Sequence, residues 1–458
     1  MRSPGSILLL SAYELGHQPA GIAVPMAFLE RAGFRPRGLD LAVEPFDEAA
    51  VRAARLVAIS VHMHTALRLG LRAAERVRAA SPEAVICFHG LYAPLHAALL
   101  REAGAAAVLG GECEEELVAL AEALERGVPA SALGRFVHDG GAAATRRKLD
   151  FPVPSRAGLP SPERYARLAD GAGERLAGHV EATRGCRHRC RHCPIPAVYD
   201  GRLFAVPVEV VVEDAARQVA AGVTHLTFGD PDFLNGPGHA LRVARALHAR
   251  FPALTFDFTA KVSHLVAHAA LLPELAACGA IFCVSAVESL SPRVLEKLDK
   301  GHSRADVFRA FAACGAAGIS LRPSLLPFTP WASLDDYLDL LEAFLREGWA
   351  AHTDPVQLSI RLLVPDGSLL LGDPGLAAGA YDPALLGHPW AHSDPRMDAL
   401  QTRVAALVEE AARCEGSPVE TFAAVHSIAL AAAGRPHEHV RSQHSGRAAP
   451  RLTESWFC

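Results

Sequence analysis

Residues 181–194 of the chain read Glu-Ala-Thr-Arg-Gly-Cys-Arg-His-Arg-Cys-Arg-His-Cys-Pro. Within this stretch Cys186, Cys190 and Cys193 are separated by three and then two residues. Three thiolates on one short loop can hold a cubane of four irons and leave the fourth iron without a protein ligand. An iron with an open position can bind a small molecule, whereas a cluster closed by four cysteines mainly transfers electrons. The spacing therefore predicts a [4Fe–4S] cluster with chemistry at the open iron.

A zinc site is the alternative interpretation of this loop, with His188 or His192 as the fourth ligand. Zinc motifs favour paired Cys-x2-Cys units, and the sequence contains no second pair. The iron–sulfur interpretation is therefore favoured. A non-catalytic iron–sulfur or zinc-sensing protein remains the alternative from another functional class.

At this loop the chain resembles the radical S-adenosylmethionine (SAM) enzymes, whose signature has the same spacing. The resemblance implies that the open iron chelates the amino and carboxylate groups of SAM. It also implies that one electron from the cluster cleaves a carbon–sulfur bond, usually releasing a 5′-deoxyadenosyl radical. The residue before the third cysteine, His192 here, would lie near the adenine. A small-molecule substrate and a flavodoxin- or ferredoxin-type electron donor are the implied partners.

Residues 176–370 alternate short apolar runs with helical patterns, which predicts a (β/α)6 partial TIM barrel. In such barrels the loops at the carboxyl ends of the strands carry the chemistry. The expected strands are 179–183, 224–228, 255–259, 281–285, 319–325 and 356–362.

Two polar residues at strand ends are candidates for SAM contacts. Gly229-Asp230 stands where the family's Gly-Gly-Glu motif accepts the amino group of SAM, so Asp230 is the candidate and Asp232 the alternative. Arg322, on the fifth expected strand, could pair bidentately with the SAM carboxylate.

A second stretch extends the resemblance. Residues 284–289 and 295–301 are similar to the family's Gly-x-Glu-Ser…Leu-x-x-Lys-Gly stretch. The resemblance implies that Ser285 and Glu288 lie close to the ribose or the carboxylate of SAM.

Residues 1–140 also alternate strands and helices, which predicts a doubly wound parallel sheet. Its ligands would lie beyond the carboxyl ends of the strands. Residues 141–175 are proline-punctuated and polar, as in a linker. The expected strands are 7–10, 38–41, 56–61, 85–89 and 106–109, and the expected helices are 22–32, 47–54, 66–80, 94–103 and 114–124.

This first unit resembles the cobalamin-binding domain that precedes the barrel in class B radical SAM enzymes. The run Gly110-Gly-Glu-Cys-Glu114 is similar to the Gly-Glu-x-Glu segment common after that domain's last strand. The Asp-x-His-x-x-Gly motif that supplies the lower axial histidine to cobalt is missing, and residues 14–21 stand in its place. Some cobalamin-dependent members also lack that histidine, so cobalamin is a possible cofactor, as is a repurposed domain.

Residues 371–458 are expected to form a helical extension. An apolar stripe predicts one helix over 397–416, and Ser417-Pro-Val-Glu420 predicts a capping box that opens a second helix to about residue 433.

The last residue, Cys458, follows the aromatic pair Trp456-Phe457. Over nearly its whole length the chain resembles the CUAEP/CCAEP-tail radical SAM proteins, which end in Cys-Cys-Ala-Glu-Pro or Cys-Sec-Ala-Glu-Pro after such a pair. We hypothesise that a UGA selenocysteine codon follows Cys458 and that the chain is a truncated selenoprotein. A thiol–selenol or dithiol tail is a soft ligand or redox partner, so Cys458 is a candidate catalytic residue.

Composition sets the broad class. The 458-residue chain is half hydrophobic and has a net charge of −5, which implies neither a nucleic-acid nor a membrane surface. The first apolar run is too short for a signal peptide, so a cytoplasmic enzyme is expected. The arginines 184, 187, 189 and 191 make the cysteine loop basic. Three roles for this charge stay open: solvated charge without a function, an offset to the negative charge of the cluster, or a docking surface for an acidic electron donor.

The sequence thus predicts an α/β radical SAM enzyme that cleaves SAM to modify an unknown substrate. In one version of this function, the substrate is a thiol, selenol or metalloid that the C-terminal tail holds. A cobalamin-dependent radical SAM methyltransferase is the alternative within enzymes.

Overall fold

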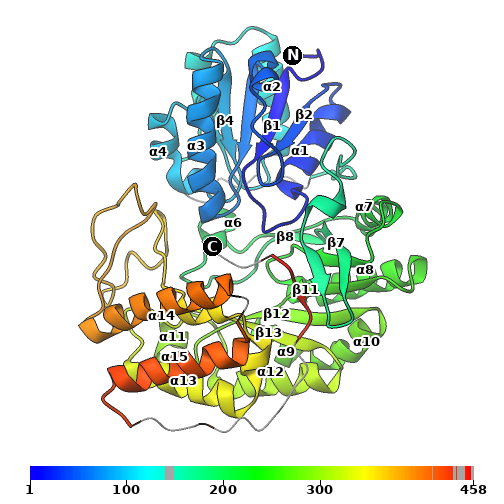
Figure 1. Ribbon diagram of the computed structural model, residues 1–458. Coiled ribbons are helices and arrows are strands. Elements are labelled where there is room, and N and C mark those ends of the chain that lie inside the picture. Colours follow the sequence, from blue (N-terminus) through cyan, green and yellow to red (C-terminus); the bar gives the residue numbers. More distant parts are fainter. Residues whose placement is uncertain (140–148, 415, 437–439, 441–448, 455–458) are drawn as a thin grey trace.

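Two α/β units lie one above the other in the structure, a computed structural model (Figure 1). It describes residues 1–139, 149–414, 416–436, 440 and 449–454. Cys458, the candidate catalytic residue of the tail, lies outside the described residues.

The N-terminal unit contains a five-stranded sheet in the order β2-β1-β3-β4-β5, with every pair parallel. This is a doubly wound order, and it confirms the expected fold of the first unit. Continuous apolar runs form the central strands because both faces of the sheet are covered. The strands are β1 (Ile7–Ser11), β2 (Arg37–Asp40), β3 (Leu56–Ser60), β4 (Val85–His89) and β5 (Ala107–Leu109).

Helices cover both faces of this sheet. Apolar residues of α1 and α5 form the core on one face, and those of α2, α3 and α4 form the core on the other. Each helix lies within three residues of its expected bounds. They are α1 (Ala20–Arg31), α2 (Glu48–Ala53), α3 (His64–Ala80), α4 (Ala97–Glu102) and α5 (Glu114–Glu125).

The second unit contains a seven-stranded sheet in the order β13-β12-β11-β10-β7-β6-β14. Five of its strands are parallel and form the curled half-barrel, while β6 and β14 extend one edge in antiparallel fashion. The parallel strands are β7 (Glu174–Val180), β10 (His225–Phe228), β11 (Thr255–Thr259), β12 (Ala280–Glu288) and β13 (Ser320–Leu325). The edge strands are β6 (Arg167–Ala169) and β14 (Arg451–Leu452).

Helices pack on the outside of the half-barrel (Figure 1). Their apolar residues and the inward residues of the strands form one large core. The helices are α7 (Val208–Ala220), α8 (Pro237–Arg250), α9 (Val262–Ala267), α10 (Leu272–Ala277), α11 (Pro292–Lys297), α12 (Arg304–Ala316) and α13 (Leu334–Arg346).

The expected sixth barrel strand is absent from the described residues. Residues Pro355–Ser359 form a 3₁₀ turn, and a single bridge joins Phe328 to Arg361. The reason is a side chain, because the Oε1 atom of Gln357 accepts a hydrogen bond from the Leu325 N–H at 2.9 Å. A side-chain amide therefore takes the ladder position that a sixth strand would occupy. The expected first strand was also misplaced, because β7 ends at Val180 and Thr183 begins a separate strand.

Two helices close the chain's C-terminal part, α14 (Pro395–Arg413) and α15 (Pro418–Ala432). Their buried residues belong to the same core as the barrel. The expected capping box at Ser417 is wrong, because the Ser417 side chain makes no cap hydrogen bond. Instead its carbonyl accepts hydrogen bonds from Thr421, through both the N–H and the hydroxyl at 2.9 Å.

The segment between the two units is hydrogen-bonded to both of them. Arg156 is buried and donates to Asp214 of α7 at 2.6 Å, to the Gln18 side chain at 3.0 Å and to the His179 carbonyl at 2.8 Å. Further along, the Tyr165 hydroxyl donates to the Asp40 carboxylate at 2.8 Å. These buried bonds fix how the N-terminal sheet faces the barrel.

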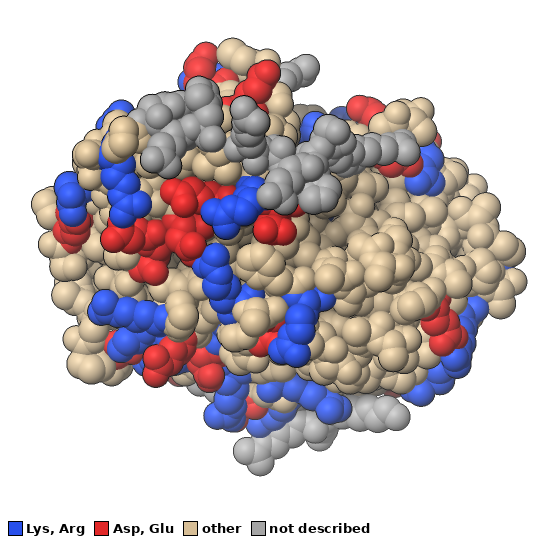
Figure 2. All heavy atoms as spheres, turned by 90° about the horizontal axis from the view of Figure 1, so that it is seen from below, with Lys and Arg blue, Asp and Glu red and all other residues tan. Residues whose placement is uncertain are grey.

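The surface is mixed in charge. On the face shown in Figure 2, acidic and basic side chains lie among one another between areas without charge. The described part of this face has no continuous basic surface of the kind that binds nucleic acid. Among the described helices, none is both long enough and apolar enough to cross a membrane.

Candidate active site

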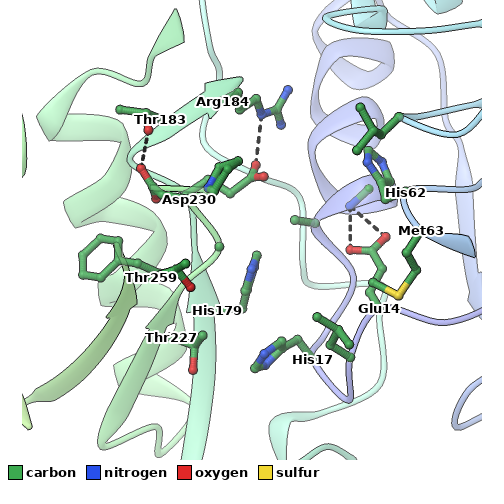
Figure 3. Close-up of a pocket in the computed structure, with 18 of the residues that line it drawn as sticks. Glu14, His17, His62, Met63, His179, Thr183, Arg184, Thr227, Asp230 and Thr259 are labelled. Atoms are coloured by element: carbon green, nitrogen blue, oxygen red, sulfur yellow. Dashed lines mark hydrogen bonds and ion pairs between the residues drawn. The ribbon is translucent and has the colours of Figure 1, made fainter. Parts of the chain in front are cut away.

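A cavity of about 370 Å³ separates the two units. Figure 3 shows its two sides, with Glu14, His17 and His62 from the N-terminal unit facing Asp230 and Thr259 from the barrel. Both sides are loops at the carboxyl ends of parallel strands, where α/β sheets and barrels place their ligands. The volume lies in the lower part of the range of about 300–1,000 Å³ for small-molecule sites.

The two ends of the cysteine loop line one side of the cavity, whereas Cys186, Cys190 and Cys193 lie outside the cavity lining. The loop leaves β8 (Thr183–Gly185), runs through the three cysteines into α6 (Ile195–Tyr199), and returns as β9 (Leu203–Ala205), which pairs antiparallel with β8. Gly185 has a φ of +75°, and a Cβ there would lie 2.4 Å from the Arg202 carbonyl oxygen. Glycine is therefore required where the loop begins.

The surroundings of the three cysteines fit a negatively charged cluster. The Asn235 side-chain N–H group lies 3.4 Å from the Cys186 sulfur, and the Lys261 ammonium lies 3.4 Å from the Cys190 sulfur. The Cys193 N–H donates to the Cys190 carbonyl at 3.1 Å, which keeps those two residues on one turn. Donors aimed at sulfur ligands tune iron–sulfur clusters.

Burial raises the pKa of the Cys193 thiol to about 12, so this sulfur needs a bound cation before it releases its proton. Sequence reasoning missed Asn235 and Lys261. The signal for Lys261 was its place two residues after the third barrel strand, where barrel enzymes carry functional groups.

His192 and Glu288 are brought together beside this loop. Both the His192 Nε2 atom and the Lys300 ammonium lie near the same Glu288 oxygen, at 3.2 and 3.1 Å. Burial alone would raise the pKa of Glu288, but Lys300 and His192 hold it well below its ordinary value. Glu288 also has a left-handed φ of +62° at the end of β12, beside a register shift in the strand pairing. Neither His192 nor Glu288 lines the cavity.

Asp230 lies in the cavity wall and anchors the start of the cysteine loop. Its carboxylate accepts from the Ala182 N–H at 2.9 Å and from the Thr183 hydroxyl. Burial raises the pKa of Asp230 to about 7, because among the described residues no cationic side chain is paired with it. An ammonium group in the cavity would stabilise its charged form. A Cβ at Gly229 would lie 2.2 Å from the His179 Nε2 atom, so the glycine leaves room for that ring.

The other predicted SAM contacts are arranged differently. Arg322 lines the cavity, but its guanidinium donates to Asp354 at 2.6 Å and to the carbonyls of Ala449 and Pro450 at 3.5 and 3.4 Å. Ser285 is fully buried outside the cavity lining, and its hydroxyl has no hydrogen-bond partner among the described residues. Asp232 does not line the cavity, and its carboxylate lies 2.8 Å from His264 Nδ1.

Arg184 connects the cysteine loop to the N-terminal unit. Its guanidinium donates to Glu181 at 3.0 Å, to Glu112 at 3.2 Å and to Glu114, and the Tyr199 hydroxyl donates to Glu112 at 2.9 Å. The Glu112 side chain is fully buried. The Gly-Glu-x-Glu segment of the N-terminal unit is thus the partner of the cysteine loop.

The arginines of the cysteine loop do not form one basic surface. Arg184 is buried among carboxylates, Arg191 donates to Asp373 at 2.7 Å, and Arg189 pairs with Asp200. Arg187 is exposed. Three of the four arginine charges are therefore paired within the protein, which disfavours the docking-surface interpretation.

Glu14, which the sequence analysis did not single out, lines the N-terminal side of the cavity, as does Glu114. Both Glu14 oxygens accept from the Gly21 N–H at 3.1 Å, and burial raises the pKa of Glu14 to about 8. The rings of His17 and His179 lie 5.0 Å apart across the cavity, and burial lowers both pKa values to about 3. Near neutral pH the cavity therefore presents a protonated carboxyl group and neutral imidazoles.

Glu14 gives the unfolding equilibrium a defined pH dependence. Since its pKa is raised from 4.5 to about 8, the folded state holds a proton that the unfolded state has released, and stability falls as pH rises through this window. Between pH 7 and 8 we expect the free energy of unfolding to fall by up to about 1.4 kcal/mol from this one group. The pKa values of His17 and His179 are lowered from 6.5 to about 3, so these groups change the free energy of unfolding only below about pH 6.5 and do not contribute between pH 7 and 8.

Chemical unfolding of the apoprotein at pH 7 and pH 8 measures this slope. Glu14→Gln keeps an acceptor for Gly21 and should reduce the fall to the part that Asp230 and Glu112 contribute, since their pKa values are raised to about 7. Glu102→Gln on the exposed surface of α4 should leave the fall unchanged. An unchanged slope in Glu14→Gln would contradict the assignment.

The described end of the chain borders the same cavity. β14 pairs with β6, Leu452 lines the cavity, and Glu454 accepts a hydrogen bond from the Tyr13 hydroxyl at 2.7 Å. Together with the Arg322 contacts, these bonds hold the C-terminal segment between the barrel and the N-terminal unit.

Comparison with known proteins adds to this geometry. Residues 180–344 match the family model of the radical SAM superfamily, and no curated protein matches the chain. Among solved structures the chain is similar to the radical SAM methyltransferase TsrM from Kitasatospora setae, with tryptophan substrate and a SAM analogue bound. The identity is 19% and the TM-score 0.56, over 74% of this chain and 71% of TsrM.

The chain is also similar to the cobalamin-dependent SAM radical enzyme OxsB, with aqua-cobalamin and SAM bound. The identity is 14% and the TM-score 0.66, over 88% of this chain and 66% of OxsB. At these identities the likeness shows the fold, which is shared over both units.

The superfamily match spans the cysteine loop and four of the five parallel strands of the half-barrel, β10 to β13. Radical SAM proteins use a [4Fe–4S] cluster and SAM, and the three-cysteine loop fits the cluster. This sets aside the alternative of a non-catalytic sensor. The chain therefore contains a radical SAM domain at residues 180–344 and is an enzyme of the radical SAM type.

Proposed function

We propose that this enzyme reductively cleaves SAM in the cavity between the barrel and the N-terminal unit, and acts there on a small molecule. The observation that carries the proposal is the cavity itself, which has the size of a small-molecule site and begins where the cysteine loop begins. When bound, the cluster supplies one electron to SAM. The protein supplies orientation and exclusion of water.

Cys186, Cys190 and Cys193 would hold the cluster, which places SAM on the loop side of the cavity. Asp230 is suited to accept the SAM ammonium group, because it is a buried carboxyl without a cationic partner among the described residues. His192 would contact the adenine, with its ring oriented by Glu288.

Ser285 and Arg322 remain proposed SAM contacts. Among the residues that the structure describes, the buried Ser285 hydroxyl has no hydrogen-bond partner and can donate to a ligand. Arg322 can reach a SAM carboxylate only if it gives up part of its bonding to Asp354 and to the C-terminal segment. We therefore propose that SAM binding and the seating of that segment are coupled through Arg322.

The substrate would bind on the N-terminal side of the cavity. Neutral His17, neutral His62 and protonated Glu14 can donate and accept hydrogen bonds there without adding charge. Such a site suits an uncharged or soft-atom substrate better than a strongly anionic one.

The C-terminal segment supports the soft-atom version of this function. Glu454 is held at the cavity by Tyr13, and Cys458 follows four residues later in the sequence. We propose that the Cys458 thiol, alone or within a CUAEP/CCAEP-type tail, holds the substrate. Cys458→Ser should then lower turnover while leaving the iron content and SAM binding unchanged. The four codons after Cys458 should read UGA followed by codons for Ala-Glu-Pro, and any other reading would contradict the selenocysteine hypothesis.

A second candidate is a cobalamin-dependent methyltransferase. The shared fold of TsrM and OxsB favours it, as do the rim residues His62 and His89, whose rings lie 6.3 Å apart on the N-terminal side. Burial lowers both pKa values, so these imidazoles are neutral and able to ligate a metal.

Product analysis separates these candidates. Protein reconstituted anaerobically with iron and sulfide is incubated with SAM and a low-potential reductant, with and without added cobalamin. We expect 5′-deoxyadenosine without cobalamin. S-adenosylhomocysteine formed only with cobalamin would favour the methyltransferase. Methylthioadenosine would favour transfer of the 3-amino-3-carboxypropyl group of SAM to the substrate. Intact SAM would contradict both proposals.

A further inference from the structure

Three potential metal ligands converge beside the cysteine loop, outside the cavity lining. His188 lies on the loop between Cys186 and Cys190, Asp232 follows β10, and His264 lies on α9. One ligand atom of each lies within 4.8 Å of the others. Three separate elements of the barrel thus contribute one side chain each to a single point.

The distances within this group match those between ligands of one ion. Asp232 Oδ2 lies 2.8 Å from His264 Nδ1 and 3.6 Å from His188 Nε2. An ion with bonds of about 2.0–2.2 Å separates neighbouring ligand atoms by about 3 Å or slightly more. The arrangement therefore needs only small movements to surround a metal ion.

The carboxylate at the centre of the group lacks the hydrogen bond that burial normally demands. Asp232 is fully buried, and its Oδ1 atom accepts from the Leu234 N–H at 3.0 Å. Its Oδ2 atom has no hydrogen-bond partner among the described residues, and neither has the facing His264 Nδ1 atom. The Oδ2 and Nδ1 atoms lie 2.8 Å apart without the geometry of a hydrogen bond, while His188 and His264 are hydrogen-bonded through their Nε2 atoms at 3.1 Å. A buried carboxylate oxygen that lacks a hydrogen bond favours a cation beside it, and the two imidazoles supply further ligand atoms at that point.

We propose that His188, Asp232 and His264 bind one divalent transition-metal ion, with Zn²⁺ as the probe. Two imidazole nitrogens and one carboxylate oxygen suit Zn²⁺ and Fe²⁺, and they leave further positions for water. The ion would tie the cysteine loop, through His188, to the end of β10 and to α9. It is distinct from the cluster because it uses none of the three cysteines.

The test uses the full-length protein with its cluster in place. Reconstituted protein is incubated with Zn²⁺, freed of excess by gel filtration, and analysed for zinc, iron and sulfide. We expect about one zinc per chain in addition to the cluster iron. X-ray absorption at the zinc edge should show nitrogen and oxygen ligands at about 2.0–2.2 Å and no sulfur at about 2.3 Å.

Matched variants assign the ion to this site. His264→Gln and Asp232→Asn should each lose the zinc while keeping the cluster iron, and the asparagine keeps an acceptor for the Leu234 N–H. His268→Gln is the control, since that ring lies 5.6 Å from His264 on the adjoining turn and is not in the group. No zinc in the parent protein, sulfur ligands, or zinc retained in both variants would each overturn the proposal. SAM cleavage is scored separately, so this result is independent of the proposed function.

Discussion

Replacing any one of Cys186, Cys190 and Cys193 with alanine is expected to abolish SAM cleavage. Two thiolates cannot hold a cubane whose fourth iron must stay open, so the cluster would be lost or incomplete. Because the electron for cleavage comes from the cluster, the residual activity should fall to the background without enzyme. The measurement is iron and sulfide content together with 5′-deoxyadenosine formed anaerobically.

The chain offers a matched control for this experiment. Cys414 is an exposed free cysteine at the end of α14, outside the radical SAM domain, so Cys414→Ala should keep both iron and activity. A cysteine-loop variant that retained full turnover would refute the cluster assignment. A variant that lost activity but kept all its iron would place the defect elsewhere.

Replacement of Arg184 with methionine should destabilise the protein more than any single surface change. The substitution leaves Glu112 and Glu114 buried without their cation, and breaking a buried ion pair in this way costs about 3–5 kcal/mol. Because the cysteine loop loses its attachment to the N-terminal unit, the cluster should also be lost more rapidly. Urea unfolding of the apoprotein measures the first effect, and the decay of cluster absorbance in chelator measures the second.

The loss of stability in Arg184→Met should depend on pH. Burial already raises the pKa of Glu112 to about 7, with Arg184 opposing the shift. Without Arg184 the pKa of Glu112 rises further, so the cost from Glu112 is small below about pH 7, where this group is protonated in both folded proteins, and it grows as the pH increases above 7. Arg187→Met, an exposed position on the same loop, should leave stability nearly unchanged. Equal effects of the two variants would show that the buried network contributes nothing.

Local patterns in the sequence determined most of the architecture. Apolar runs gave the strands of the N-terminal sheet and four of the five parallel barrel strands at nearly their observed positions, because strand formation depends on short-range hydrophobic pattern. Helices α14 and α15 were equally clear. The spacing of Cys186, Cys190 and Cys193 predicts a cluster on this loop, since a metal cluster needs its ligands close together in space.

Contacts between distant segments could not be predicted in the same way. Gln357 replaces the sixth strand by reaching Leu325, and Arg322 bonds to Asp354 and to the C-terminal segment as well as lining the cavity. The buried partnership of Arg184 with Glu112 joins residues 72 positions apart. No local pattern specifies such pairs.

The sequence alone thus determined the kind of fold, the cysteine loop and the edge at which ligands should bind. Only the tertiary structure decided which side chains meet at that edge, and it brought His188, Asp232 and His264 together from three elements. The physical reason is that periodicity and spacing act within one element, whereas burial, ion pairing and ligand convergence depend on how separate elements pack.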